Sequence, residues 1–236
     1  MNTKRKYLAF DIETAKTTED GTDWRSCRPL GISCAATLLA DSTELRLWHG
    51  GKDRTSPADR MGPQDAGGLV EYLATQAENG YTIVTWNGLG FDFDILAEES
   101  GMLERCRSLA KSHVDLMFHV LCQLGHGVGL DAAAKGMGLG GKSKGMSGAL
   151  APVLWAQGRR EEVLEYVAQD VKTTLELATT CAASGVMRWF ARSGKLRSMP
   201  LPSGWLTVEA AEKLPMPDTS WMTDPLSRKT MMEWMG

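Results

Sequence analysis

The order of its strand-like and helical segments is the feature that most constrains how this chain can fold. Strand-like runs are apolar and partly β-branched, whereas helical runs repeat apolar residues every three or four positions. Along the chain we expect three strands at 6–12, 31–40 and 43–48, a helix at 64–78, a strand at 81–86, and then mostly helices with one more strand at 111–115. This order predicts an α/β fold in which a mixed sheet is flanked by helices.

Helical patterns dominate the second half of the chain. We expect helices from Phe91, at 104–109, from 116 to 124, at 130–135, at 148–157 and at 159–181. The last has the clearest apolar stripe, formed by Val163, Leu164, Val167, Val171, Leu175 and Ala178. After residue 183, prolines and methionines become frequent. We therefore predict a domain over 1–183 and a C-terminal extension over 184–236 that packs on this domain or docks a partner.

Composition excludes several classes of protein. The 236 residues are 43% hydrophobic, which suits a globular domain with its own core, and no apolar run approaches the ~20 residues of a membrane span. The basic start leads directly into a strand, so we expect no signal peptide. The five cysteines are scattered and lack Cys-x-x-Cys pairs, and the histidines have no metal-ligand spacing. These features predict a cytoplasmic protein without membrane, disulfide framework or zinc site.

Acidic and basic residues are unevenly distributed, although the net charge is only −3. Residues 132–160 and 177–208 contain lysine and arginine but no acid. An anionic polymer needs such a basic approach to a cluster of carboxylates. A solvated surface with uneven charge explains the same pattern, so charge alone leaves both interpretations open.

Three short acidic motifs occur at plausible edges of these elements. Asp11 and Glu13 lie two residues apart in a strand, which directs both to one face. Asp92 follows the glycine-containing turn 87–90 at a helix start, and Tyr166 lies one helical turn before Asp170. Two-metal phosphodiester hydrolysis requires carboxylates from different elements, because Mg²⁺ and Mn²⁺ prefer oxygen ligands. The motifs therefore indicate a metal-dependent phosphodiesterase.

In this order, Asp11-x-Glu13, Asn87-x-x-x-Phe91-Asp92 and Tyr166-x-x-x-Asp170 resemble the three exonuclease motifs of the DEDD superfamily. A tyrosine four residues before the last aspartate resembles the DEDDy branch. The resemblance covers residues 6–180 and leaves the extension unmatched. It implies a ribonuclease H-like fold, with a mixed five-stranded sheet whose second strand is antiparallel.

The resemblance also implies an activity, a 3′–5′ exonuclease that releases nucleoside 5′-monophosphates from single-stranded DNA or RNA ends by a two-metal mechanism. The ligands of the two Mg²⁺ or Mn²⁺ ions would be the carboxylates of Asp11, Glu13, Asp92 and Asp170. Tyr166 would orient the attacking water, while Asn87 and Phe91 would contact the nucleic acid. Asp94 competes with Asp92, but Asp92 directly follows the aromatic residue of the motif. Asp115 is expected to be structural or to support the ligands.

A P-loop pattern competes with this interpretation. Residues 136–143 satisfy Gly-x4-Gly-Lys-Ser, but a helical pattern precedes them, whereas a phosphate-binding P-loop follows a buried strand. We favour a flexible basic loop beside the active site, in which Lys142 and Lys144 contact backbone phosphates. A plain surface loop is the alternative.

The extension leaves two further interpretations open. Trp189 and Phe190 lie among basic residues and could stack a base, although packing of an amphipathic element on the sheet also explains them. The tail aromatics and methionines could bury within the protein or dock a partner or a second copy of the chain. A nucleic-acid-binding or scaffold subunit that acts through this tail is therefore the alternative to an exonuclease.

Overall fold

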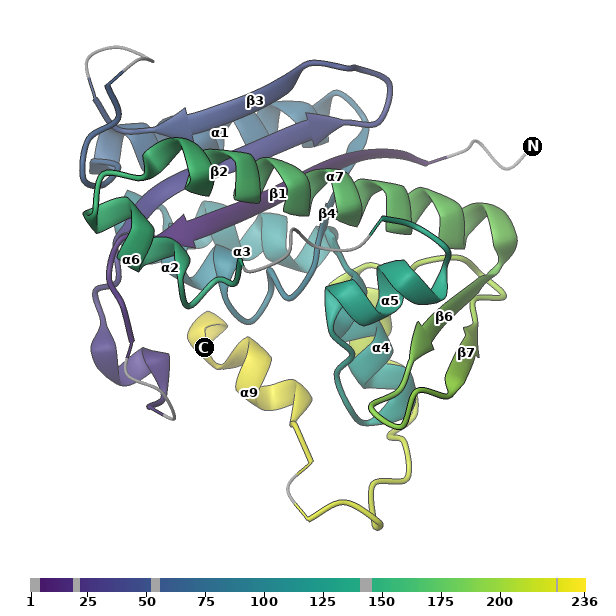
Figure 1. Cartoon of the computed structure of the whole chain (residues 1–236). Coiled ribbons are helices and arrows are strands. Elements are labelled where there is room, and N and C mark those ends of the chain that lie inside the picture. The colour runs from purple at the N-terminus through teal and green to yellow at the C-terminus, as the bar shows by residue number, and fades with distance from the viewer. Residues whose placement is uncertain (1–4, 19–21, 52–55, 141–145, 224) are drawn as a thin grey trace.

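Strand β1 (Lys6–Thr14) lies in the middle of a five-stranded sheet in the computed structural model, which describes residues 5–18, 22–51, 56–140, 146–223 and 225–236. Its partners are β2 (Ile32–Leu39), β3 (Leu45–His49), β4 (Tyr81–Thr85) and β5 (Val114–Asp115). The strand order is β3-β2-β1-β4-β5 (Figure 1). β2 is antiparallel to β1 and β3, whereas β4 is parallel to β1 and β5. The predicted mixed sheet with an antiparallel second strand is confirmed.

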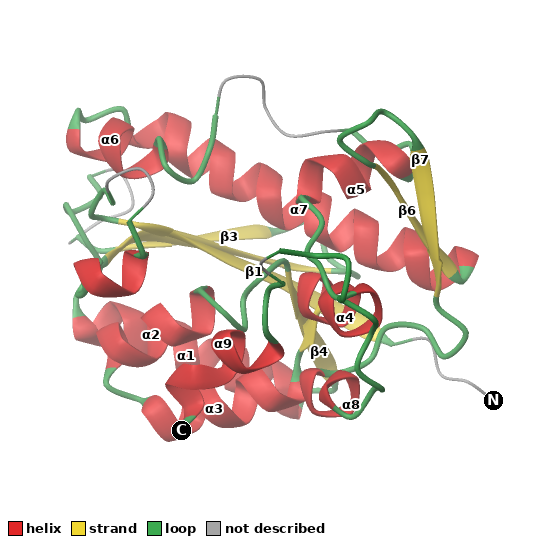
Figure 2. Ribbon diagram, turned by 90° about the horizontal axis from the view of Figure 1, so that it is seen from below, coloured by secondary structure: helices red, strands yellow, loops and turns green. Residues whose placement is uncertain are grey.

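Helices cover both faces of this sheet (Figure 2). One face carries α5 (Leu130–Gly136), α6 (Ala151–Ala156) and the long α7 (Arg160–Ser184). The opposite face carries α1 (Pro63–Glu78), α2 (Asp92–Ser100) and α3 (Leu103–Ser112). Helix α4 (Leu116–Leu124) follows β5 directly, and a short 3-10 helix, η1 (Trp24–Cys27), interrupts the connection from β1 to β2. The α/β fold expected from the segment order, with helices flanking a mixed sheet, is therefore present.

The alternation of side chains along β1 separates two apolar clusters. Leu8, Phe10 and Ile12 are buried in the cluster that includes α1, α2 and α3. Tyr7 and Ala9 point to the other face and are buried with residues of α7. Each large apolar side chain buried in this way contributes roughly 1.5–3 kcal/mol to folding. The face of β1 toward α7 is thus apolar at its start, and its next two positions are Asp11 and Glu13.

The extension forms a hairpin and short helices. These elements are β6 (Val186–Phe190), β7 (Leu196–Pro200), α8 (Val208–Glu212), α9 (Arg228–Met232) and the 3-10 helix η2 (Glu233–Met235). Trp205 is buried and donates its indole N–H to the carbonyl oxygen of Ala178, at 3.1 Å. Arg228 donates to the carbonyl oxygen of Cys122, at 2.6 Å. These contacts tie the extension to α7 and α4, while the domain boundary at residue 183 stays a prediction.

Strand β5 is shorter than predicted. Helix α3 continues to Ser112, so β5 is confined to Val114 and Asp115 instead of beginning at 111. None of the helices in the described residues combines the length and the apolar character needed to cross a membrane.

Candidate functional site

The acidic end of β1 forms one wall of the site. Asp11 and Glu13 follow Tyr7 and Ala9 on the strand face toward α7, because side chains two residues apart share a face. On the neighbouring β2, Ala36 and Cys34 pair with these two positions, and both are buried. Small partners leave space in front of the two carboxylates.

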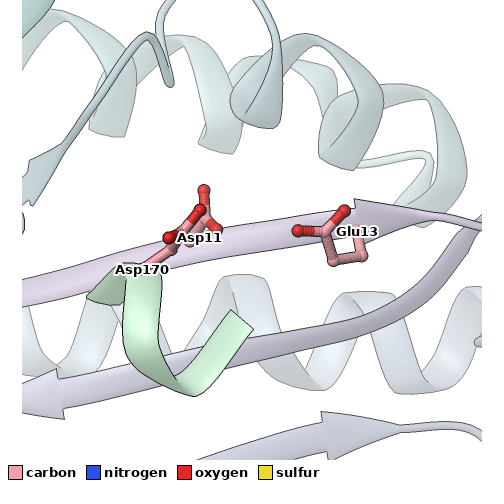
Figure 3. Close-up of side chains that lie close together, drawn as sticks. All are labelled: Asp11, Glu13 and Asp170. Carbon is pink, nitrogen blue, oxygen red and sulfur yellow. The ribbon is translucent and has the colours of Figure 1, made fainter. Parts of the chain in front are cut away.

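Helix α7 forms the opposite wall and brings in the third motif. Tyr166 and Asp170 lie one turn apart on its buried side and are 2% and 6% exposed. Ligand oxygens of Asp11, Glu13 and Asp170 all lie within 4.8 Å of one another. Figure 3 shows the first two side chains on β1 and the third on α7. Three carboxylates this close repel one another, and a divalent cation with a preference for oxygen ligands would offset that repulsion.

Tyr166 lies in the electrostatic field of this carboxylate cluster. Burial raises the pKa of its phenol well above the usual value, and the charges of Asp170, Glu13 and Asp11 raise it further. A hydrogen bond with Asp170 acts in the same direction. The phenol therefore stays protonated near neutral pH. In this state it can hold a water molecule by hydrogen bonds, but it cannot act as a base.

Asp92 lies beside the carboxylate cluster without joining it in this structure. As the first residue of α2 it is 3% exposed, and its Oδ1 accepts from the backbone N–H of Ile12 at 2.9 Å. That N–H lies between the two acidic residues of β1, so the bond fixes α2 to the strand. Burial and the nearby charge of Asp115 raise the pKa of Asp92 to about 7, despite hydrogen bonds with Ile12 and Asp11 that favour its charged form.

Asp115 organises the loop that precedes Asp92. Its carboxylate accepts the backbone N–H groups of Asn87, Leu89 and Phe118 at 3.1, 2.8 and 3.0 Å. Asn87 has a φ of 72°, a left-handed conformation that costs free energy unless its surroundings hold it. The Asp115 bonds supply that restraint. Asp115 is therefore a structural acid.

Gly88 in this loop lies against Thr85. A Cβ atom at Gly88 would lie 2.5 Å from the Thr85 hydroxyl oxygen, so only glycine fits there without rearrangement. The Thr85 hydroxyl also accepts from the Gly88 backbone N–H at 3.2 Å. Close packing of the loop on β4 therefore explains why residue 88 is a glycine.

A cleft of about 480 Å³ connects these residues. The predicted site residues that line it are Asp11, Glu13, Asn87, Phe91, Asp92, Tyr166 and Asp170. Other residues also line the cleft but were not predicted from the sequence as site residues, among them Thr14, Trp86, Met117, Asp131 and Thr174. Of these, only Asp131 carried a usable signal, as an acid in the first turn of a helix that begins after Gly129.

The glycine-rich segment with the P-loop pattern begins at Gly136, the last residue of α5, and runs through residues that the structure does not describe. Lys142 and Lys144 lie outside the described residues, so their contact with phosphate stays a prediction, although nearby Gly148 lines the cleft. Gly136 ends helix α5, and a Cβ there would lie 2.4 Å from the Cα of Trp189. A helix thus precedes the P-loop pattern, and its first glycine is explained by packing against β6.

A match to a protein-family model identifies the superfamily of this chain. A model described as the RNase_H superfamily matches residues 47–182, which is more than half of the chain. The chain belongs to the RNase_H superfamily. The matched range of this RNase_H chain contains Asp92, Tyr166 and Asp170, while Asp11 and Glu13 precede it. Membership indicates a nuclease, and such nucleases generally use divalent metal ions, which suits the acidic cluster.

Part of one solved structure has the same fold as this RNase_H-superfamily chain. That structure is the family B DNA polymerase from the hyperthermophilic archaeon Pyrobaculum calidifontis, with a TM-score of 0.55 and 21% sequence identity. The match covers 75% of this chain but only 24% of the polymerase chain. At this identity the likeness concerns the fold alone. No curated protein sequence matches the chain.

Proposed function

We propose that this chain is a DEDDy-type 3′–5′ exonuclease that removes nucleotides from single-stranded DNA or RNA ends. The observation that carries the proposal is the convergence of Asp11, Glu13 and Asp170 within 4.8 Å, with Tyr166 one turn from Asp170. Asp92, on the same cleft, completes the set of four acids. Carboxylate oxygens at this density suit Mg²⁺ or Mn²⁺.

The four carboxylates would hold two metal ions, whose positive charge would stabilise the attacking and leaving oxygens. The Tyr166 hydroxyl orients a water molecule toward the phosphorus. The water oxygen bonds to phosphorus and loses a proton to solvent, while the bond between phosphorus and the 3′ oxygen breaks and that oxygen takes up a proton from solvent. The products are a nucleoside 5′-monophosphate and a strand with a new 3′-hydroxyl. Asn87 and Phe91 contact the terminal nucleotide, since both line the same cleft.

The proposed substrate is a single strand because the terminal nucleotide must enter a cleft bounded by β1, α7 and the loop before α2. We place this activity in the cytoplasm, which the five free cysteines support.

Incubation of 5′-labelled DNA and RNA oligonucleotides with Mn²⁺ tests the proposal. The wild type should produce a ladder of shortened products and release nucleoside 5′-monophosphates, and a 3′-terminal phosphate should slow it. Asp11→Ala and Asp170→Ala should each lose activity by at least about a hundredfold. Glu165→Gln, on the exposed side of α7, should match the wild type.

Equal degradation by the wild type and both alanine variants would exclude the proposed site. An absence of metal-dependent cleavage with every substrate, together with retained binding of oligonucleotides, would instead favour the nucleic-acid-binding or scaffold subunit.

A further inference from the structure

A second hollow lies next to the catalytic cleft. Its volume is about 670 Å³, and it is bounded by the turn after α4, by β6 with the residues that follow it, and by residues 221–223. Val128 and Gly129 line both this hollow and the cleft. The two depressions therefore meet at one short segment of backbone, and a chain-like ligand could pass from one to the other.

Two aromatic side chains that line the hollow, those of Phe190 and Trp221, are exposed to solvent. On β6, Met187 and Trp189 are buried, so the alternation of the strand directs Arg188 and Phe190 outward. Phe190 is 44% exposed, and Trp221 from the tail is 70% exposed. The Trp221 ring also lies edge-on to His126, with 6.2 Å between the ring centroids. Exposed aromatic rings around a depression provide faces on which planar ligands can stack.

The charge of the hairpin complements a polyanion. Its basic residues are Arg188, Arg192, Lys195 and Arg197, all exposed. Among the described residues none of these four forms an ion pair with an acid, and the sequence from 177 to 208 contains no acid. Arg192 lines the hollow together with Phe190. Cations interleaved with aromatic rings are typical of grooves that bind single-stranded nucleic acids.

We infer that this hollow binds the nucleotides on the 5′ side of the scissile phosphodiester. Bases of the single strand stack on Phe190 and Trp221, and Arg188 and Arg192 contact its phosphates. The inference rests on the proposed function, because the strand held here is the substrate of the adjoining cleft. It also assigns a role to the extension, which supplies both stacking residues.

Two assays with one set of variants test the inference. The first measures binding of a labelled single strand of about 12 nucleotides by fluorescence anisotropy in EDTA. The second measures Mn²⁺-dependent hydrolysis of the p-nitrophenyl ester of thymidine 5′-monophosphate, which is too short to reach the hollow. The Phe190→Ala/Trp221→Ala double variant should bind the strand about tenfold or more weakly and hydrolyse the ester at the wild-type rate. Leu103→Ala, at a 40% exposed residue of α3 outside both depressions, is the matched control.

The outcomes separate the two proposals. Unchanged strand binding by the double variant would overturn the role of the hollow, whether or not the ester is hydrolysed. Weakened binding by the double variant, with no hydrolysis of ester or strand by the wild type, would support the hollow and refute the exonuclease. A wild type that binds no single strand but captures an apolar peptide would identify a protein-docking surface and overturn the inference.

The salt dependence of binding tests the phosphate contacts proposed for Arg188 and Arg192. Loss of two phosphate contacts in Arg188→Ala/Arg192→Ala should flatten the dependence of log binding constant on log salt by about 1.4, since each contact to a single strand contributes about 0.7. Lys111→Ala, an exposed cation on α3, should leave the slope unchanged. Equal slopes for the wild type and the arginine variant would show that phosphates do not lie along β6.

Discussion

Trp234 donates its indole N–H to the carbonyl oxygen of Leu89, with 2.7 Å between the two atoms. The backbone N–H of Leu89 is bound in turn by the Asp115 carboxylate. The loop between β4 and α2 is therefore held on one side by Asp115, which ends β5 and caps the N-terminus of α4, and on the other by the end of the extension. Met231 packs on this loop as well, since a Cβ at Gly90 would lie 3.2 Å from its Cε.

Trp234→Phe should lower the free energy of unfolding by about 1–3 kcal/mol, because it removes the N–H that satisfies the carbonyl oxygen of buried Leu89. Urea denaturation measures the change. Trp221→Phe is the matched control, since its indole is 70% exposed and its N–H donates to the carbonyl oxygen of Asp218 in the same tail. It should change stability by less than about 0.5 kcal/mol. Similar losses in the two variants would mean that the bond to Leu89 adds nothing specific.

Gly136→Ala should destabilise the protein by about 1–3 kcal/mol, because the new Cβ would lie 2.4 Å from the Cα of Trp189 and 2.5 Å from the Arg188 oxygen. These are backbone atoms, so the hairpin has to move away from α5. Gly68→Ala is the control, in an exposed and uncrowded part of α1, and it should stabilise by about 0.5–1 kcal/mol. Thermal unfolding compares the two. A gain for both would show that β6 does not depend on contact with α5.

His119 should make the protein less stable in acid. Its burial lowers the pKa to about 4, from 6.5, and its Nδ1 accepts from the Leu206 backbone N–H at 3.3 Å. The unfolded chain binds a proton below pH 6.5 that the folded chain accepts only near pH 4, so stability falls as the pH drops through this window. The histidine therefore costs about 2 kcal/mol of stability near pH 5, relative to neutral pH.

His119→Asn isolates this contribution, because an asparagine oxygen can accept the same N–H and does not titrate. Urea denaturation at several pH values should show that the stability advantage of the wild type over the variant shrinks by about 2 kcal/mol between pH 7 and pH 5. A difference that is independent of pH would indicate that the histidine has the same pKa in the folded and unfolded chains, and therefore that burial does not lower it.

Tyr166→Phe should lower kcat between about tenfold and a hundredfold while leaving Mn²⁺ affinity nearly unchanged. The hydroxyl is proposed to orient water, whereas the metal ligands are carboxylates. Phenylalanine keeps the buried ring that packs between α7 and β1. Single-turnover rates on a labelled single strand, together with Mn²⁺ titration, separate the two effects. Full activity in the variant would make Tyr166 a core residue only.

The elements of the sheet and α7 could be predicted because their signals are local. Alternation in β1 and the stripe on α7 are periodic, and they already imply which faces carry Asp11, Glu13 and Asp170. The extension could not be predicted in this way. Its β6–β7 hairpin and the burial of Trp205 depend on Gly136 and Ala178, which are distant in sequence. Asp131 had a local signal, as an acid in the first turn of a helix, but that signal does not tell that the fold brings α5 to the cleft.

Manganese binding tests the proposed metal site, because hydrolysis by two metal ions requires Asp11, Glu13 and Asp170 to hold divalent cations together. Calorimetric titration of the wild type with Mn²⁺ should show binding that weakens at least about tenfold in Asp170→Asn, with no loss of folding in circular dichroism. Glu165→Gln should bind as the wild type does. Equal Mn²⁺ affinity in all three proteins would contradict a metal site between β1 and α7.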